Sequence, residues 1–316
     1  METQIKKQPV KRTRKTEGLN ISPFLWFDTQ AEEAANFYTQ LFNDSKIESI
    51  TYYGAEGAAV SGMEEGAVMT VGFSLEGQDF TALNGGREFE LSPAISFVVN
   101  CDDEQELNTL WAKFSEKATT VMDLKKYSFS DKYGSLKDPF GVTWQFTIGT
   151  AMQKITPHLM FTGIQYGKAE EAMNFYISLF DHSGIIHIEY YGPSEEEFEG
   201  TVRQARFSIN EQEFMAADSN TGQEFTFTPA MSFVVKCDTQ EEIDHFWNNL
   251  TLGADEKAQQ CGWLKDRYGV SWQIVPRALE EMLSDPDAGK SERVMRAMIP
   301  MKKLNLQTLT EAYDKE

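Results

Sequence analysis

The sequence predicts an α+β protein that consists of two similar tandem domains followed by a helical C-terminal extension. Three observations predict this class. Short strand-like runs alternate with amphipathic helix patterns, one series of motifs occurs twice in the same order, and residues 277–316 have no counterpart in the first half. A chain of 316 residues that is 41% apolar is long enough for two domains with sizeable cores.

The internal repeat comprises three pairs of motifs. AEEAANFYTQLF (31–42) recurs as AEEAMNFYISLF (169–180), PAISFVVNCD (93–102) as PAMSFVVKCD (229–238), and GSLKDPFGVTWQ (134–145) as GWLKDRYGVSWQ (262–273). A repeat this long fits homologous domains and not the units of a solenoid. We expect a disordered basic leader (1–19), a first domain (20–150), a second domain (154–276) and the helical extension (277–316).

Each repeat is predicted to contain two modules of the order β-α-β-β-β. The first modules open with strand-like runs at 21–27 and 155–161, and an apolar helix stripe follows each run. The middle strands are expected at 47–53, 67–75 and 79–83, and at 185–191, 201–209 and 213–217. The second modules open with the apolar strands 95–99 and 231–235, continue with a helix, and close with a glycine-bearing turn and a strand.

Three predicted helix starts carry a capping-box pattern, in which a side-chain oxygen is followed three residues later by Glu. The pairs are Thr29 with Glu32, Asp103 with Glu106, and Thr239 with Glu242. In the extension, helices are expected over 278–283 and 291–298, and Pro300 ends the second one.

The net charge is −20, which argues against proteins that wrap nucleic acid or adhere to anionic membranes. No apolar run is long enough for a transmembrane helix. Three cysteines, an odd number in a long chain, argue against a disulfide scaffold and for a reducing compartment, so we expect a cytoplasmic protein. Cys101 and Cys237 end equivalent strands and are expected in the core.

The motifs ISPFLWFDTQAEEAANFYTQLF, ALNGG, AISFVVNCDDEQELNTLW and CGWLKDRYGVSWQIVP resemble the PhnB-like branch of the vicinal-oxygen-chelate superfamily. This branch is often labelled 3-demethylubiquinone-9 3-methyltransferase, and the superfamily includes glyoxalase I, extradiol dioxygenases and bleomycin resistance proteins. The resemblance implies paired βαβββ modules that curl a mixed sheet into a ligand-binding cup. It also implies an internal pseudo-dimer, which could form a homo-oligomer. Whether each cup forms within one repeat or by exchange of modules stays open.

The resemblance also indicates where a metal would bind. Metal-using relatives place His, His and Glu on the inward faces of the first, fifth and last strands. The corresponding residues here are Ser22, Ser96 and Gln145 in the first repeat and Thr156, Ser232 and Gln273 in the second. Hydroxyls and amides are poor ligands for a transition metal, so we expect no metal and no other cofactor. A divalent metal is the lesser alternative, because a shift of two residues would bring in His158.

The methyltransferase label is not expected to describe the activity. The turn Asn84-Gly85-Gly86 is not followed by a helix pattern, and the repeats lack the β-α-β-α order of a doubly wound cofactor-binding sheet.

Seven side chains are the predicted ligand contacts: Trp26, Gln145, His158, Cys261, Trp263, Lys265 and Gln273. The tryptophans would form apolar walls, and the glutamines and His158 would provide hydrogen bonds. Lys265 would orient an anionic ligand. Cys261 is either a buried inert thiol or, if Lys265 or Arg267 lowers its pKa, a reactive one. The second repeat is favoured as the active cup, because it contains His158, Cys261 and Trp263.

The leading hypothesis is therefore a protein that binds a small organic ligand without a metal, as bleomycin-sequestering relatives do. One alternative is a metal-dependent lyase, isomerase or dioxygenase of the same superfamily. Another is an interaction protein in which the pseudo-dimer, the leader or the C-terminal helices contact a partner. The sequence assigns no catalytic residue.

Overall fold

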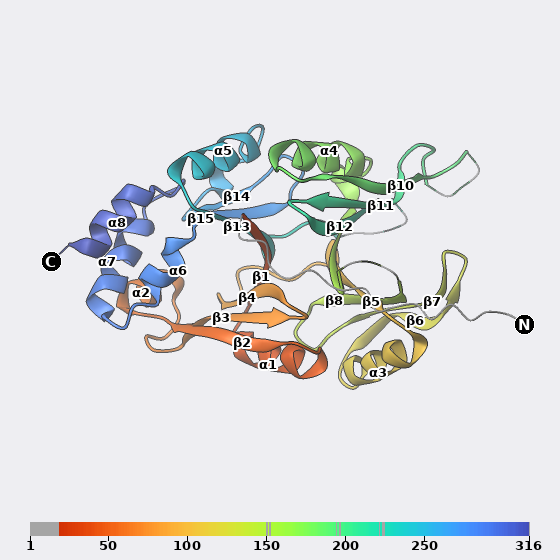
Figure 1. Cartoon of the computed structure of the whole chain (residues 1–316), viewed down its shortest axis with the longest axis horizontal. Coiled ribbons are helices and arrows are strands. Elements are labelled where there is room, and N and C mark those ends of the chain that lie inside the picture. The colour runs from red at the N-terminus through yellow and green to blue at the C-terminus, as the bar shows by residue number, and fades with distance from the viewer. Residues whose placement is uncertain are drawn as a thin grey trace, which may run out of the picture.

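The computed structural model describes residues 19–149, 151, 153–193, 195, 197–220, 222 and 225–315. The predicted basic leader, 1–19, lies outside these residues apart from Leu19. The fold is α+β with a helical C-terminal extension, as predicted (Figure 1). Within the described ranges, no helix has the length and apolar character needed to cross a membrane.

The first repeat contains two modules. The first module runs β1 (Asn20–Phe27), α1 (Ala31–Leu41), β2 (Lys46–Tyr52), α2 (Ala55–Ser61), β3 (Val68–Leu75) and β4 (Gln78–Asn84). The second runs β5 (Ile95–Cys101), α3 (Glu104–Ser115), β6 (Thr119–Tyr127), β7 (Ser130–Lys137) and β8 (Thr143–Ile148). Both follow the predicted order, with the short helix α2 as an insertion.

The second repeat departs from that order in its last module. Its first module runs β9 (Ile155–Phe161), the 3-10 turn η1 (Gly163–Gln165), α4 (Ala169–Leu179), β10 (Gly184–Tyr190), β11 (Val202–Ile209) and β12 (Gln212–Asp218). The last runs β13 (Met231–Cys237), α5 (Gln240–Leu250), the 3-10 turn η2 (Glu256–Ala258), β14 (Trp263–Lys265) and β15 (Ser271–Pro276). The prediction of four equal modules was wrong here, because η2 stands where β6 stands in the first repeat.

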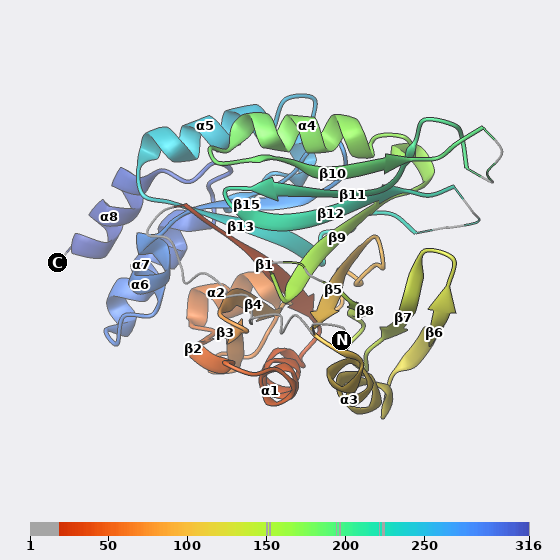
Figure 2. The same cartoon turned by 45° about the vertical axis from the view of Figure 1, so that its right-hand side comes forward.

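The two sheets exchange modules between the repeats. One sheet has seven strands in the order β14-β15-β13-β1-β4-β3-β2, and the other has eight in the order β10-β11-β12-β9-β5-β8-β7-β6. Each sheet therefore joins the first module of one repeat to the second module of the other. The junctions are the antiparallel pairs β1–β13 and β5–β9, which lie side by side at the centre of the molecule (Figure 2).

Within each repeat, the two modules are held together by a buried aspartate in the turn before the last strand. Asp138 accepts hydrogen bonds from the Tyr38 hydroxyl at 2.6 Å, from Trp144 Nε1 at 2.8 Å and from two backbone N–H groups of its own turn. Asp266 has the same set of partners, with Tyr176 at 2.7 Å. Since Tyr38 is on α1 and Asp138 precedes β8, this contact joins the first module to the second.

Two of the three predicted caps are confirmed. Asp103 accepts from the Glu106 N–H, and Thr239 forms a complete capping box with Glu242. The box at Thr29 was wrong: α1 begins at Ala31, and the side chain of its N-cap residue, Gln30, accepts no hydrogen bond from the first turn of the helix. Asn84, at the end of β4, instead accepts from the Ala31 N–H at 2.8 Å. A neighbouring strand thus supplies the cap that we expected from the local sequence.

The extension consists of α6 (Ala278–Leu283), α7 (Ala288–Met298) and α8 (Leu306–Asp314). These helices form their own small core, and Val275 of β15 packs against it. The extension also contacts the opposite edge of the seven-stranded sheet, because Glu292 of α7 accepts from the Glu56 N–H of α2 at 3.1 Å. In Figure 1 it lies at the left, beside β15 and α2.

Candidate ligand-binding site

A polar network lies on the inner face of the eight-stranded sheet, the face turned away from the packed helices. On β9, Ile155 and Leu159 belong to the hydrophobic core, so His158 points to the opposite face. Ser96 of β5 is paired directly with His158 across the two strands. Gln145 of β8 contacts both of these residues.

The network is connected through the Gln145 amide. Gln145 Nε2 lies 2.8 Å from the Ser96 hydroxyl oxygen and 3.2 Å from His158 Nδ1. The Tyr133 hydroxyl on β7 donates to Gln145 Oε1 at 2.9 Å. We call these four residues, Tyr133, Gln145, Ser96 and His158, the histidine network.

The histidine network carries no charge at neutral pH. His158 is only 6% exposed, and burial lowers the pKa of its imidazole from 6.5 to about 4. Burial also raises the pKa of the Tyr133 phenol, so the phenol stays protonated. The network contains no carboxylate. Its chemistry is therefore that of neutral hydrogen-bond donors and acceptors.

The inner face of the seven-stranded sheet has a different character, because it carries an aromatic cluster. Trp263 of β14 packs edge-to-face against Phe24 and Trp26 of β1, with ring centroids 5.3 and 6.2 Å apart, and Phe89 packs against Trp26 at 5.0 Å. Phe24 pairs across the strands with Ser232, as His158 pairs with Ser96. The two inner faces thus place Phe24 and His158 at equivalent positions.

The ALNGG motif (82–86) contacts the Trp26 ring of this aromatic cluster. A side chain at Gly85 would place its Cβ 2.2 Å from the Trp26 ring, so only glycine leaves room for the indole. The Trp26 Nε1–H donates to the Gly86 carbonyl at 2.8 Å. No helix follows this turn, and the next element is β5, in agreement with the expectation that the motif is not a cofactor-binding turn.

The predicted contact residues fall into two groups. Trp26, Trp263 and Gln273 lie on the seven-stranded sheet, where Gln273 Nε2 donates to Ser232 at 3.0 Å. Gln145 and His158 lie together on the eight-stranded sheet. The prediction that His158, Cys261 and Trp263 share one cup was wrong, because the exchange of modules separates the strands of the second repeat.

Cys261 and Lys265 also lie on the seven-stranded side. Cys261 directs its thiol to the Met298 and Ile299 carbonyl oxygens of the extension, and burial raises the pKa of this thiol. Burial thus favours the inert thiol over a thiol activated by Lys265 or Arg267. Lys265 pairs with Ser271 and lies on the same face of β14 as Trp263, two residues away.

Sequence reasoning missed Tyr133, Phe24 and Phe89. Phe24 could have been found by strand alternation, because it lies two residues before Trp26 on the same face. Tyr133 aligns with Cys261 in the repeat and carried no motif. The sequence placed Ser96 and Thr156 on the inward faces of their strands. In the structure, the residue paired with Ser96 is His158, two positions beyond Thr156. This is the shift of two residues considered above for the first strand.

The side chains present do not fit the His, His and Glu set of a catalytic metal site. The histidine network offers one imidazole, an amide and two hydroxyls, and the Nδ1 atom of that imidazole already faces the Gln145 amide. On the other face, the corresponding residues are Phe24, Ser232 and Gln273. No cluster of three or more His, Cys, Asp or Glu side chains suited to a metal occurs within the described ranges.

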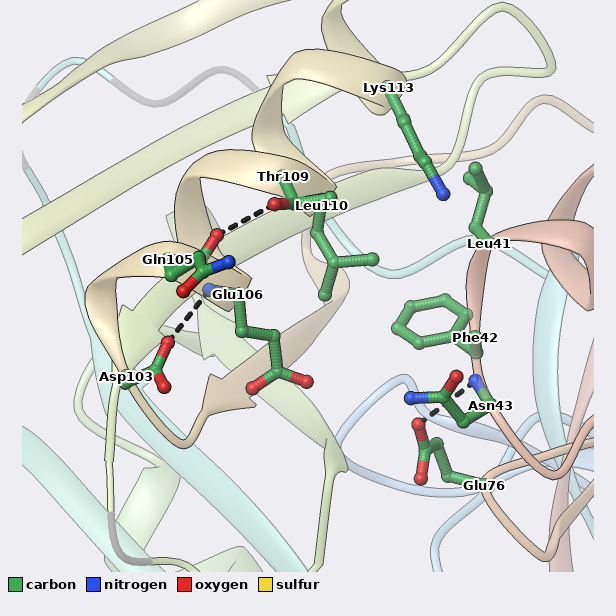
Figure 3. Close-up of a pocket in the computed structure, with 10 residues that line it drawn as sticks. All are labelled: Leu41, Phe42, Asn43, Glu76, Asp103, Gln105, Glu106, Thr109, Leu110 and Lys113. Carbon is green, nitrogen blue, oxygen red and sulfur yellow. Dashed lines mark hydrogen bonds between the residues drawn. The ribbon is translucent and has the colours of Figure 1, made fainter.

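A hollow of about 300 Å³ lies on the outer surface, between the end of α1 and α3 (Figure 3). Two of its carboxylates have partners, since Asp103 caps α3 and Glu106 pairs with Lys154. In the second repeat, the residues equivalent to Thr109 and Leu110 are His245 and Phe246, and Phe246 stacks on Phe180 at 4.6 Å. The hollow thus arises where smaller side chains replace larger ones, and it is remote from both inner faces.

Comparisons with known proteins find several similar structures. A PhnB protein from Bacillus cereus, described as a putative 3-demethylubiquinone-9 3-methyltransferase, is 40% identical, and its structure matches 40% of this chain and 96% of its own length with a TM-score of 0.37. Glyoxalase I from Zea mays is 10% identical and matches 84% of this chain and 95% of its own length with a TM-score of 0.53, a likeness of fold alone. No curated protein matches the sequence.

The family model described as 3-demethylubiquinone-9 3-methyltransferase matches the chain twice, at residues 19–147 and 153–275. Together these matches cover most of the sequence. The chain therefore belongs to this PhnB-like family, with two copies of the family's unit in one polypeptide.

Proposed function

We propose that this protein binds a small organic ligand on the inner face of the eight-stranded sheet, at the histidine network, and that it does so without a metal. The observation that carries the proposal is a buried, uncharged set of hydrogen-bonding groups on the face of the sheet opposite the hydrophobic core. Specific ligand sites combine an apolar surface with a few fixed polar groups, and Gln145 and His158 are such groups.

Several features support this choice over the other inner face. There the position equivalent to His158 is Phe24, and the rings of Trp26 and Trp263 already contact each other. The extension is also anchored on that side, where the Cys261 N–H donates to the Met301 carbonyl at 2.7 Å. The aromatic cluster, with Gln273 and Lys265, is the second and less polar candidate surface.

The proposal excludes a methyltransferase activity that requires a doubly wound cofactor-binding sheet, because the strands here follow a different topology. We also propose a cytoplasmic location, because the three cysteines are free thiols and free thiols are typical of a reducing compartment. A metal-dependent lyase, isomerase or dioxygenase is disfavoured because the four residues of the histidine network include only one imidazole and no carboxylate.

The test is a screen of neutral and anionic metabolites by thermal shift. A ligand at 100 times its Kd stabilises the folded state by about 2.7 kcal/mol. Gln145→Leu should weaken binding of any hit at least tenfold, whereas the matched change on the other sheet, Gln273→Leu, should leave the affinity unchanged. The opposite pattern would assign the ligand to the aromatic cluster and refute the proposal.

Metal content is measured on the same preparation by elemental analysis. We expect less than a tenth of an equivalent of Fe, Mn, Ni or Zn after purification without chelator. A stoichiometric metal that chelation removes together with ligand binding would overturn the metal-free part of the proposal.

A further inference from the structure

The tautomer of His158 follows from the hydrogen bonds of its neighbours. Gln145 Nε2 has two hydrogens, and its two acceptors in the structure are the Ser96 oxygen and His158 Nδ1. An Nδ1 atom that accepts a hydrogen bond carries no proton. A neutral imidazole has one N–H group, so the proton must reside on Nε2.

Tyr133 decides which way the Gln145 amide points. A phenol is a strong donor and a weak acceptor, so its hydroxyl favours the amide oxygen, and the Tyr133 oxygen lies 2.9 Å from Gln145 Oε1. This contact turns the NH₂ group toward Ser96 and His158. On the other sheet, Gln273 also directs its NH₂ group to the equivalent serine, Ser232.

His158 Nε2 is left as an unpaired donor. Within the described ranges, the structure gives this atom no hydrogen-bond partner. The fully buried side-chain nitrogens that lack a partner there are those of Gln78 and Gln212, so Nε2 is not sealed inside the core. The ring itself is more than nine-tenths buried and directed to the inner face. A donor of this kind favours a ligand atom that accepts a hydrogen bond.

We propose that Tyr133, acting through Gln145, holds His158 in the Nε2–H tautomer, so that the site selects ligands that present a carbonyl or another acceptor oxygen and discriminates against amines. This inference rests on the proposed function for its ligand class, but the tautomer can be measured without any ligand. Tyr133 is here a positioning residue, since it acts on the ligand only through Gln145 and His158.

The test is the ring ¹⁵N spectrum of His158 at pH 8, in which the two neutral tautomers have distinct shifts. We expect more than nine-tenths Nε2–H in the wild type. In Tyr133→Phe the amide is free to turn, and Nδ1–H should appear. Tyr127→Phe is the matched control, because this nearby phenol donates to the Asp123 carbonyl and does not touch Gln145. It should retain the wild-type spectrum.

A second variant keeps the inference testable if Tyr133→Phe does not fold. In Gln145→Glu the carboxylate has no hydrogen to donate, so His158 Nδ1 must carry a proton to remain hydrogen-bonded. A wild-type ring in the Nδ1–H form, or a Tyr133→Phe ring that stays entirely Nε2–H, would overturn the inference.

The ligand class is tested in the same spectra with two probes of similar size. Cyclohexanone, which offers only an acceptor oxygen, should shift the His158 Nε2–H signal, and cyclohexylamine should not. If cyclohexylamine shifted this signal and cyclohexanone did not, the proposed preference for acceptor oxygens would be refuted. If the tautomer is confirmed and no compound in the screen binds, the proposed function fails instead, and the two failures remain distinct.

Discussion

The pH dependence of stability tests the electrostatics of the histidine network most directly. Burial lowers the pKa of His158 from 6.5 to about 4, so the unfolded chain binds a proton in this range that the folded chain does not. The free energy of unfolding therefore falls as the pH falls through 6.5, and the loss is complete below pH 4. Between pH 8 and pH 5, His158 should account for a loss of about 2 kcal/mol.

The perturbation that isolates this effect is His158→Phe, because Phe24 occupies the equivalent position on the other sheet. Urea unfolding of the wild type and the variant at pH 8 and pH 5 gives four free energies. The variant should lose about 2 kcal/mol less than the wild type between the two pH values.

The comparison cancels the other titrating groups. Asp266, for example, has its pKa raised to about 6 by burial, which acts in the opposite direction, since the folded state then binds the extra proton. This group is present in both proteins. If the two proteins lost the same stability, His158 would titrate in the folded state near its ordinary value, and the description of the network as buried and neutral would be wrong.

Two further predictions concern the seven-stranded side. Gly85→Ala should destabilise the protein by about 1–3 kcal/mol in urea unfolding, because its Cβ would overlap the Trp26 ring, whereas Gly184→Ala has open space and should cost nothing. Cys261 should react with iodoacetamide at pH 8 more slowly in the folded protein than after unfolding, because burial raises the pKa of its thiol. Mass spectrometry that found rapid alkylation of Cys261 in the native protein would contradict this.

Local patterns predicted the elements well, because the information that defines them is local. The expected strand 79–83 is β4 at Gln78–Asn84, and the expected strand 201–209 is β11 at Val202–Ile209. The boxes at Asp103 and Thr239 are found as predicted, since both partners lie within one helical turn. The cap of α1 was not predictable in this way, because Asn84 reaches it from a strand 53 residues away.

The candidate site was predicted one residue at a time and not as an assembly. Alternation along β9 indicated that His158 faces inward, and the structure confirms this orientation. Its neighbours could not be inferred, because Gln145 belongs to the other repeat and Tyr133 to a hairpin without a motif. The sequence also suggested that Cys261 and Trp263 accompany His158, and the exchange of modules places them on the other sheet.

The sequence by itself determined that this chain contains one unit twice, which family the unit belongs to, and which face of each strand is apolar. These properties depend on composition and on spacing along the chain. Only the tertiary structure decided which modules share a sheet, and therefore that His158 meets Ser96, Gln145 and Tyr133. Strand pairing depends on contacts between distant segments, and two similar repeats offer similar strand edges for both pairings. Buried contacts such as the hydrogen bond between Tyr38 and Asp138 join the two modules of one repeat without strand pairing. Strands β1 and β5 pair instead with β13 and β9 of the other repeat.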